Sequence, residues 1–366
     1  MTPTHRSALL GAVSAFALLA GSARAATLSA TPANIVAQVR AAHPGDVVEM
    51  QAGAWGDLNL NNIVKASPGV TIHPAAGVAI TVPSLDTQGS SWLTIENLDV
   101  QFSGKGAVKA VNLSLDSHIT INKVKIHQAS AANADGFGPY IRNASYVTVS
   151  NSEIYYLGIA IASLDSDHTT VTNTNIHDVT DDIMDLFGSP NATITGNTAT
   201  AGNFSGSHPD FIQFDVGATH KDNCGSDVEN NRYDRGTSKT LANGIFGIVV
   251  CNSVIKGNVL RGANGNGIYI GASHDLQITG NFVQGYKDMG SNIIVSADDT
   301  NVTVTGNAAN GYVVAEAERG PGFNDRAKNN SIDKTNSAIR EADHGNDTAL
   351  TTWRAQRGAA TATSTK

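Results

Sequence analysis

The sequence predicts an all-β protein whose chain winds as a single-stranded parallel β-helix of about ten coils. Two observations predict this fold, the composition and an internal repeat. The 366 residues include 36 glycines and only 15% charged residues, and long helical patterns are nearly absent, which is typical of many short strands joined by turns. Ten segments of alternating apolar and polar residues recur 22 to 34 residues apart, as expected of stacked coils. Their central apolar residues, which we call the anchor residues, are Ile72, Ile95, Ile121, Val149, Val171, Ile194, Val228, Ile255, Ile278 and Val304.

Asparagine recurs at one place in the later repeats, three residues after the anchor residue. Five occurrences at a single offset indicate one corner of successive coils, where the asparagine side chains would stack in the interior. Their amides would bond coil to coil and satisfy the buried backbone of the turn. These asparagines are Asn197, Asn231, Asn258, Asn281 and Asn307.

The only two cysteines, Cys224 and Cys251, each lie four residues before an anchor residue. Adjacent coils are separated by about 4.8 Å, the spacing of neighbouring strands. That separation falls within the usual Cα distance of a disulfide. We therefore predict that Cys224 and Cys251 are bonded, as exported proteins allow.

The N-terminal segment is typical of export. Residues 1–25 combine Arg6, an apolar run and a small-residue cleavage site, which predicts a secretory signal peptide. The run is too short for a comfortable membrane span, so we expect a secreted or periplasmic protein without a membrane segment after cleavage. Residues 26–50 predict an N-terminal cap, in which a helix over Pro32 to Ala42 with Thr31 as its N-cap covers the first coil.

The repeat predicts a β-helix over residues 51–330 and fades beyond them. Residues 331–366 predict a C-terminal cap followed by a disordered tail. Short helices are expected over Ser337 to Ala342 and Ala349 to Gln356, and the tail from Arg357 onward.

The net charge limits the possible partners. It is −8, and loss of the two arginines of residues 1–25 would take it to −10, because that segment holds no acid. Such a protein is a poor candidate for binding nucleic acid, whose phosphates require clustered Lys and Arg. An acidic polysaccharide would also be repelled, unless a bound cation or a local basic patch intervenes.

Over residues 45–330 the repeat resembles the right-handed parallel β-helix superfamily of pectate-lyase-like proteins. The resemblance implies a right-handed helix. It does not fix the activity, because this fold carries lyases, hydrolases, epimerases, tailspikes and adhesins.

Two acid-rich segments lie at matching places in successive repeats, Thr180 to Phe187 and His208 to Asp215. The alternation predicts two columns of solvent-facing side chains on neighbouring coils, with His208 over Asp182. Stacked acids repel unless they share a proton, bind a cation or act in catalysis, and an exposed aromatic beside them suits a sugar ring. One column is Asp185, Gln213, Phe246 and Tyr269, and the other is Asp182, Asp210, Asn243 and Asn266.

The first acidic segment, followed by Gly188 and Ser189, resembles the pectate lyase coil that carries Ca²⁺ ligands. The resemblance implies that Asp181 and Asp185 bind Ca²⁺, and we add Asp210 from the next coil. The bound cation would neutralise a uronate carboxylate so that a base can remove the neighbouring proton. The chain differs from that family in two ways. His208 to Asp210 stand where the family has a substrate-binding lysine, and the family's catalytic arginine motif is not found in this sequence.

These considerations predict an exported enzyme that acts on a polysaccharide, most simply a lyase that cleaves a uronate-containing glycan by cation-assisted β-elimination. The predicted catalytic residues are Asp182, Asp185, His208, Asp210 and Arg235. The predicted substrate-binding residues are Gln213, Asp215, Lys221 and Tyr269.

Three alternatives remain open at the level of sequence. Paired aspartates would also serve an inverting glycoside hydrolase, and a His/Asp group would serve a uronate C5-epimerase. A β-helix that only binds glycan, as an adhesin does, requires no catalytic group at all. The sequence does not identify the sugar, the linkage, endo or exo action, or the oligomeric state.

Overall fold

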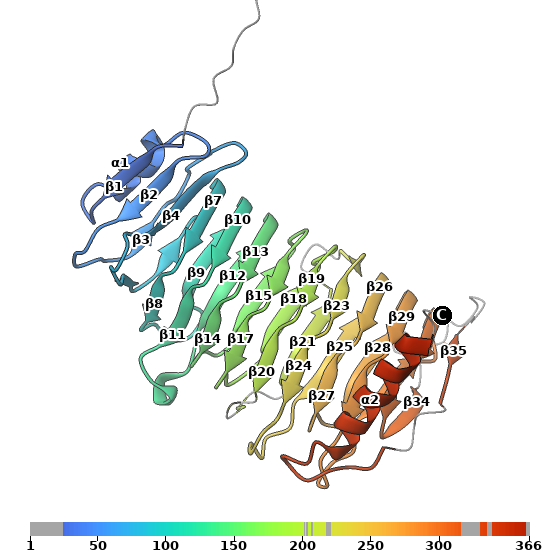
Figure 1. The fold of residues 1–366 in the computed structure, drawn as a ribbon. Helices are drawn as coiled ribbons and strands as arrows, with labels where there is room; N and C mark the ends of the chain where they lie inside the picture. The colour runs from blue at the N-terminus through green and yellow to red at the C-terminus, as the bar shows by residue number, and fades with distance from the viewer. Residues whose placement is uncertain are drawn as a thin grey trace, which may run out of the picture.

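The computed structural model describes residues 25–363, apart from 201, 203, 206–207, 217–220, 316–329 and 335–338, and apart from the side chains of 314–315 and 358–363. The signal peptide predicted for residues 1–25 therefore lies outside the described residues, except for Ala25. The chain winds as a long solenoid in which every coil lies on the one before it (Figure 1). Three parallel sheets of 14, 11 and 10 strands, here sheets A, B and C, run along the solenoid. No helix in the described ranges is long and apolar enough to cross a membrane.

Sheet A contains the anchor residues. Each anchor residue pairs with the anchor residue of the next coil, from Ile72 with Ile95 to Ile278 with Val304. All ten are at most 2% exposed, which confirms that the alternation marks strands with one buried face. The strands of sheet A are β1 (Thr27–Ala30), β2 (Val47–Met50), β4 (Val70–Pro74), β7 (Ser91–Glu96), β10 (Ser117–Asn122), β13 (Ser145–Ser150), β16 (Thr170–Thr172), β19 (Thr193–Thr195), β22 (Asn223–Cys224), β23 (Asp227–Glu229), β26 (Val250–Lys256), β29 (His274–Thr279), β32 (Thr300–Thr305) and β35 (Ser331–Ile332).

Sheet B precedes sheet A in each coil and carries both acid-rich segments. Sheet C follows sheet A, after the corner that holds the asparagines. The strands of sheet B are β3 (Leu58–Asn59), β6 (Leu85–Asp86), β9 (Lys109–Ser114), β12 (Phe137–Arg142), β15 (Ile161–Leu164), β18 (Met184–Phe187), β21 (Asp210–Asp215), β25 (Asn243–Ile248), β28 (Asn266–Gly271), β31 (Asn292–Ser296) and β34 (Gly311–Ala315). The strands of sheet C are β5 (Thr81–Val82), β8 (Asp99–Phe102), β11 (Lys125–Gln128), β14 (Glu153–Tyr155), β17 (Asn175–His177), β20 (Thr198–Thr200), β24 (Arg232–Asp234), β27 (Val259–Arg261), β30 (Phe282–Gln284) and β33 (Ala308–Ala309).

The predicted asparagine ladder is present at the corner between sheets A and C. Asn258 illustrates its bonding. Its Nδ2 donates to the carbonyl oxygen of Val228 at 2.8 Å and to Oδ1 of Asn281 at 2.9 Å, while its own Oδ1 accepts from the backbone N–H and Nδ2 of Asn231. The other members repeat this pattern, and all five are buried. The ladder therefore satisfies buried backbone groups that apolar side chains would leave unpaired.

Replacing Asn258 with Ala should destabilise the fold by about 3 kcal/mol, because it leaves buried donors and acceptors of three coils without partners. The free energy of unfolding from urea denaturation measures the loss. Thr303→Ala, at a half-buried outward position of sheet A, is the control and should change stability by less than about 0.5 kcal/mol. Equal losses for the two variants would contradict a stabilising role for the ladder.

Cys224 and Cys251 form the predicted disulfide. The two residues are in register between β22 and β26, with their Cα atoms 4.3 Å apart. The bond links neighbouring coils at the end of the longest insertion between anchor residues, from Ile194 to Val228. It therefore closes the 27-residue segment between the two cysteines and ties two adjacent coils together.

The N-terminal end partly matches the prediction. Helix α1 (Ile35–Ala41) packs against β1 and β2 through buried Ile35 and Val39, as a capping helix should. Its N-cap is Asn34 and not Thr31, since the backbone N–H of Thr31 itself donates to Asn34 Oδ1. Strands β1 and β2 continue sheet A, so this segment also extends the stack.

The C-terminal helix differs from the prediction in length and position. Helix α2 (Thr348–Thr363) continues beyond Gln356 into the expected tail, whereas the described residues 339–342 of the other expected helix are not helical. Leu350 packs against Val259, Phe282 and Ala308, so α2 lies along the side of the last coils rather than over their open end (Figure 1). One further short element, the 3₁₀ helix η1 (Ala131–Asn133), lies between β11 and β12.

Candidate active site on sheet B

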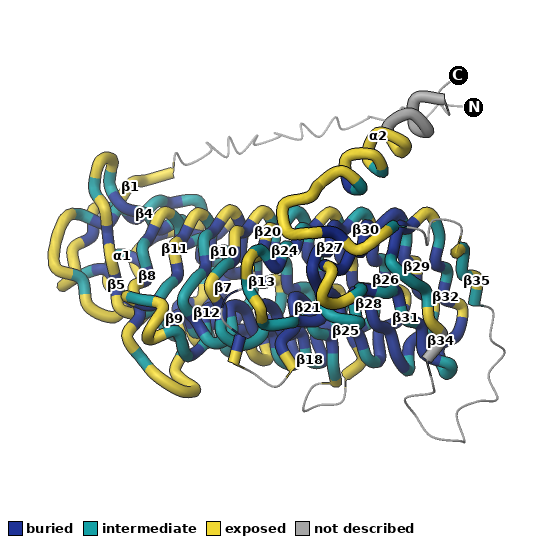
Figure 2. The backbone as a smooth tube through the Cα atoms, turned by 90° about the horizontal axis from the view of Figure 1, so that it is seen from below, coloured by how far each residue is buried: buried dark blue, intermediate teal, exposed yellow. Residues whose placement is uncertain are grey.

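The carboxylates of the two acid-rich segments meet at the beginning of β18 and β21, and we call Asp181, Asp182, Asp185 and Asp210 the acid cluster. The backbone N–H of Asp210 donates to Asp182 Oδ1 at 2.8 Å, which joins the two coils. The sequence predicted solvent-facing acids, and this prediction is wrong for two members. Asp185 is 6% exposed and Asp210 is fully buried, in a part of sheet B that is mostly buried (Figure 2). In a stack each outward side chain is covered by its neighbours above and below, so an outward direction alone does not give contact with solvent.

Burial dominates the electrostatics of the acid cluster. Loss of hydration raises the pKa of Asp185 and of Asp182, and the neighbouring carboxylates raise both further. The same cause, loss of hydration, raises the pKa of Asp210 to about 8 and that of Asp181 to a smaller extent. At neutral pH the cluster therefore holds protons that ordinary aspartates have lost.

Two buried oxygens of the acid cluster accept no hydrogen bond, namely Asp185 Oδ1 and Asp210 Oδ1. The other oxygen of Asp210, Oδ2, lies 2.9 Å from Nδ1 of His208. His208 was expected over Asp182, but it stands over Asp210, with Asn243 Nδ2 3.0 Å from its Nε2. Half of the His208 side chain remains exposed, so the imidazole lies between the buried carboxyl of Asp210 and solvent.

The outward column of sheet B has the predicted register. Asp185 pairs with Gln213, Gln213 with Phe246, and Phe246 with Tyr269. The rings of Phe246 and Tyr269 stack with centroids 4.8 Å apart. Tyr269 is only 7% exposed, which corrects its expected role as an open platform for a sugar. Gln213 and Phe246 are half-buried and remain accessible from outside.

A cavity of about 450 Å³ lies on the other side of Asp185, toward the N-terminus. It exists because the column continues from Asp185 to Ala162 and then to Tyr140, so that a small side chain separates the acid from the aromatic ring. Lys109 on β9 places its Nζ 3.9 Å from the centre of the Tyr140 ring. The lining residues are Ala107, Lys109, Phe137, Tyr140, Ile159, Ala162, Leu164, Asp185 and Phe187.

The sequence analysis missed Lys109 and Tyr140, although a signal was available. Aligning the strands that precede Ile121, Val149 and Val171 in the same way places Tyr140 in the column of Asp185. The predicted column runs only from Asp185 toward the C-terminus and therefore leaves Tyr140 out.

Three predicted site residues lie apart from the acid cluster. Arg235 follows β24 in sheet C, where its Nη2 contacts Asp288 Oδ1 at 2.7 Å and its guanidinium lies over Tyr286. It is not among the charged groups that shift the pKa of the cluster. Asp215 ends β21 beside Phe187, and its Oδ1 accepts from the backbone N–H of the next residue. Lys221 is exposed on the loop that follows β21.

Potential metal ligands gather as a compact group of three at one place in the described part of the chain, Asp222, Cys224 and Cys251. Both cysteines belong to the disulfide, so this group is not a metal site. The predicted set of Asp181, Asp185 and Asp210 does not bring three ligand oxygens within 4.8 Å of one another. The unpaired oxygens of Asp185 and Asp210 are nevertheless the donors that a hard cation prefers.

Stacked parallel coils with a buried acid cluster on one sheet define this molecule as a parallel β-helix protein. The chain belongs to the right-handed β-helix family, whose model, described as "Right handed beta helix region", matches residues 83–209 and 135–309. The predicted handedness is thereby confirmed. No curated protein matches the chain in sequence.

Solved structures share the fold at low sequence identity. An alginate lyase from Paenibacillus sp. str. FPU-7 is 16% identical with a TM-score of 0.47, covering 80% of this chain and 99% of its own. PfbA, a surface adhesin of Streptococcus pneumoniae, is 13% identical with a TM-score of 0.49, covering 78% and 86%. DFA-IIIase from Arthrobacter chlorophenolicus A6 is 11% identical with a TM-score of 0.48, covering 77% and 94%. The likeness concerns the fold alone, because proteins with different names and roles share it.

Proposed function

We propose that this protein is an exported enzyme that acts on an acidic polysaccharide, and that it cleaves a uronate-containing glycan by β-elimination. The observation that carries the proposal is the acid cluster, whose carboxyls have raised pKa values and whose member Asp185 lines a cavity together with Lys109 and Tyr140. Buried carboxyls without partners destabilise a fold, and such groups in a concave site are typical of function. Export rests on the signal peptide predicted for residues 1–25 and is consistent with the disulfide.

Each side chain has a role that follows from its position. Lys109 supplies a positive charge to the cavity that Asp185 also lines. A uronate carboxylate in this cavity would therefore lie near a cation as well as near the acids. Tyr140 is only 8% exposed and lies under Lys109 Nζ, so its ring shapes the cavity wall and holds the lysine in place. His208, held by Asp210 and Asn243, is the half-exposed group that can accept a proton from the sugar and return it to solvent.

A divalent cation such as Ca²⁺ is the group we propose for the cluster, because Asp185 Oδ1 accepts no hydrogen bond and carboxylate oxygens are the donors that a hard cation prefers. We propose Asp185 and Asp210 as its ligands, with Asp181 at the entrance as a further oxygen donor. When bound, the ion would neutralise the uronate carboxylate and lower the cost of removing the adjacent proton.

A glycoside hydrolase is the second candidate, and the raised pKa of Asp210 favours it. A general acid must still hold its proton at working pH, and burial gives Asp210 this property. In that mechanism Asp182 would hold the attacking water as the base.

The two candidates differ in their products. Incubation with polygalacturonate, alginate and a neutral glycan should give unsaturated sugar ends, seen as a rise in ultraviolet absorbance, with an acidic polymer only. Chelation should reduce the rate and added Ca²⁺ should restore it. New reducing ends without the absorbance rise would instead show hydrolysis. Intact glycans throughout the panel would contradict both mechanisms and favour a binding protein.

Lys109→Ala tests the cavity. Loss of its charge should raise KM for the acidic polymer about tenfold with a smaller change in kcat, because the contact exists in the ground state as well. Lys125→Ala is the matched control, because Lys125 also belongs to the N-terminal half but lies on sheet C beside Glu153. If the two substitutions changed KM equally, the cavity would not be part of the substrate-binding site.

A further inference from the structure

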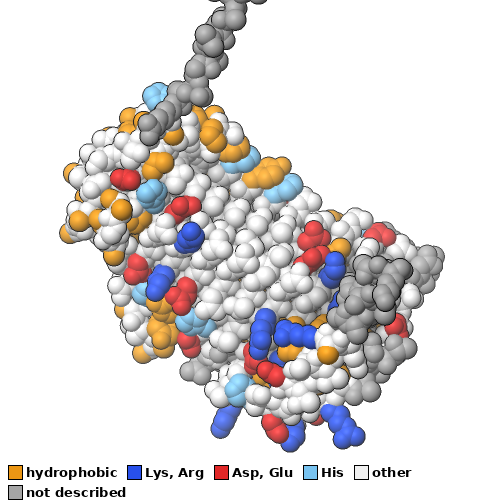
Figure 3. Space-filling view, viewed as in Figure 1, with side chains coloured by type: hydrophobic (Ala, Val, Ile, Leu, Met, Phe, Trp, Pro, Cys, Tyr) orange, Lys and Arg blue, Asp and Glu red, His pale blue; other side chains and the backbone are white. Residues whose placement is uncertain are grey.

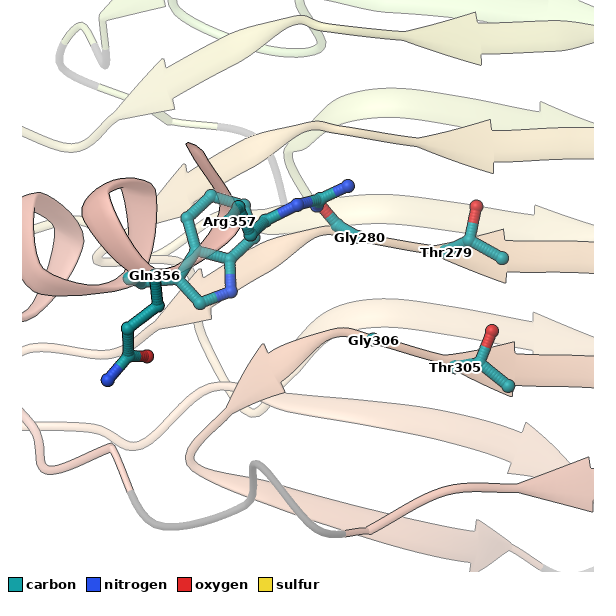
Figure 4. A pocket seen from close by; sticks show the side chains of 7 residues that line it. Thr279, Gly280, Thr305, Gly306, Gln356 and Arg357 are labelled. Carbon is teal, nitrogen blue, oxygen red and sulfur yellow. The ribbon is translucent and has the colours of Figure 1, made fainter. Parts of the chain in front are cut away.

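Helix α2 crosses the corner between sheets A and C, on a different face of the solenoid from the acid cluster. At this corner a glycine directly follows the sheet A strand in each of three successive coils, with a positive φ of 62° to 67°. The three glycines are Gly257, Gly280 and Gly306. Glycine adopts this conformation without strain and leaves the corner free of side chains. The space beside Gly280 is occupied by the guanidinium of Arg357, which donates to the Gly280 carbonyl oxygen (Figure 4).

Two cavities open on either side of the contact between Arg357 and Trp353. The larger, about 470 Å³, lies between α2 and the outward threonines at the ends of β29 and β32 (Figure 4). The smaller, about 250 Å³, lies toward the preceding coil. Trp353 and Arg357 line both cavities, so the two form one groove beneath α2. The groove is lined by Asn230, Lys256, Gly257, Thr279, Gly280, Thr305, Gly306, Trp353, Arg354, Gln356 and Arg357.

The groove is positively charged although the whole chain has a net charge of −8. Its ionisable lining residues are all basic: Lys256 and Arg354 are exposed, and Arg357 is engaged with Gly280 and Trp353. Figure 3 shows Lys and Arg side chains on this part of the molecule, with Asp and Glu side chains beside them. Two acids flank the groove without lining it. Glu229 is in register with Lys256, and Asp333 follows the strand that pairs with β32.

The chemistry of the lining is that of sugar recognition. Trp353 is partly exposed, and its indole is held in place by Phe282, at a centroid distance of 5.4 Å, and by the Arg357 guanidinium, 5.0 Å from its ring centre. Thr279, Thr305 and Gln356 provide hydroxyl and amide groups at the rim. Aromatic rings pack on sugar faces, hydroxyls and amides pair with sugar hydroxyls, and cations pair with carboxylates.

We propose that this groove is a second binding site for an acidic polysaccharide, separate from the acid cluster on sheet B. It would hold a distant part of the same polymer chain and raise the local concentration of substrate at sheet B. The proposal extends the proposed function, but binding in the groove requires no catalysis.

The test measures binding in an Asp185→Asn background, so that turnover does not interfere. Affinity electrophoresis in gels containing alginate or polygalacturonate compares this protein with one that also carries Lys256→Glu and Arg354→Glu. Both residues are exposed and neither packs in the core, so the fold should remain, as thermal unfolding will show. The matched control carries Arg40→Glu and Lys123→Glu, the same charge change at the other end of the solenoid.

We expect the groove variant to bind acidic polymer at least about tenfold more weakly, with the control unchanged and no retardation by neutral dextran. Equal retardation of groove variant and control would overturn the proposal. So would equally tight, groove-dependent binding of polyglutamate, which would show a general polyanion patch without sugar recognition. If the site on sheet B cleaved no glycan, the proposed function would fail, but this test could still be interpreted, because it measures binding directly.

Discussion

Asp185→Asn should reduce the turnover of an acidic glycan by a factor on the order of 10² to 10⁴, the usual contribution of a positioned acid–base or ligand carboxyl. Asp185 borders the cavity, and the neighbouring charge of Asp182 helps to raise its pKa. An amide of the same shape can neither exchange a proton nor neutralise a cation. The initial rate of product formation on the best substrate of the glycan panel measures the loss.

The same substitution should make the fold more stable at neutral pH by about 1 to 3 kcal/mol. The folded protein must keep a proton on Asp185 that the unfolded chain releases, and Asn removes this requirement. Asp86→Asn is the matched control, because Asp86 lies in the same outward column but accepts hydrogen bonds from Asn112 and Gln88. A fully active Asp185→Asn enzyme would eliminate the acid cluster as the catalytic centre.

Stability should fall as pH rises from about 4 to about 8, by about 2 to 4 kcal/mol in the absence of divalent cations. The pKa of Asp210 is about 8 in the folded protein, against an unfolded value of 3.8. Between these values the folded state binds more protons than the unfolded state, so the free energy of unfolding decreases with pH. The stabilising effect of this protonation is complete below about pH 4 and absent above about pH 8. Urea denaturation across this range measures the slope.

Asp210→Asn isolates the contribution of the cluster to this slope. Burial also raises the pKa values of Asp116 and Asp299 to about 7, so the wild-type slope has several sources. The difference between wild type and Asp210→Asn removes these shared terms, and the variant should show the flatter profile. Added Ca²⁺ should flatten the wild-type profile above pH 7 if it binds the ionised cluster. Parallel profiles for wild type and variant would mean that Asp210 titrates normally.

The sequence alone determined the register of the coils. Anchor residues, ladder asparagines and the pair Cys224–Cys251 recur at fixed offsets because each coil must place its apolar residues over those of the previous one. The two-residue alternation of a strand then determines which side chains face outward. The column from Asp185 to Tyr269 could therefore be predicted from the sequence alone.

Only the tertiary structure decided what surrounds those side chains. Whether Asp210 meets solvent depends on its neighbours in adjacent coils, and on His208 above it. Lys109 precedes Asp185 by 76 residues in the sequence but lines the same cavity. The cavity exists because the small side chain of Ala162 leaves space between Tyr140 and Asp185. The position of α2 depends on a glycine corner and on a buried contact of Leu350, neither of which the repeat encodes. Register is a property of the local period, whereas burial and cavities depend on side-chain volumes from several coils at once.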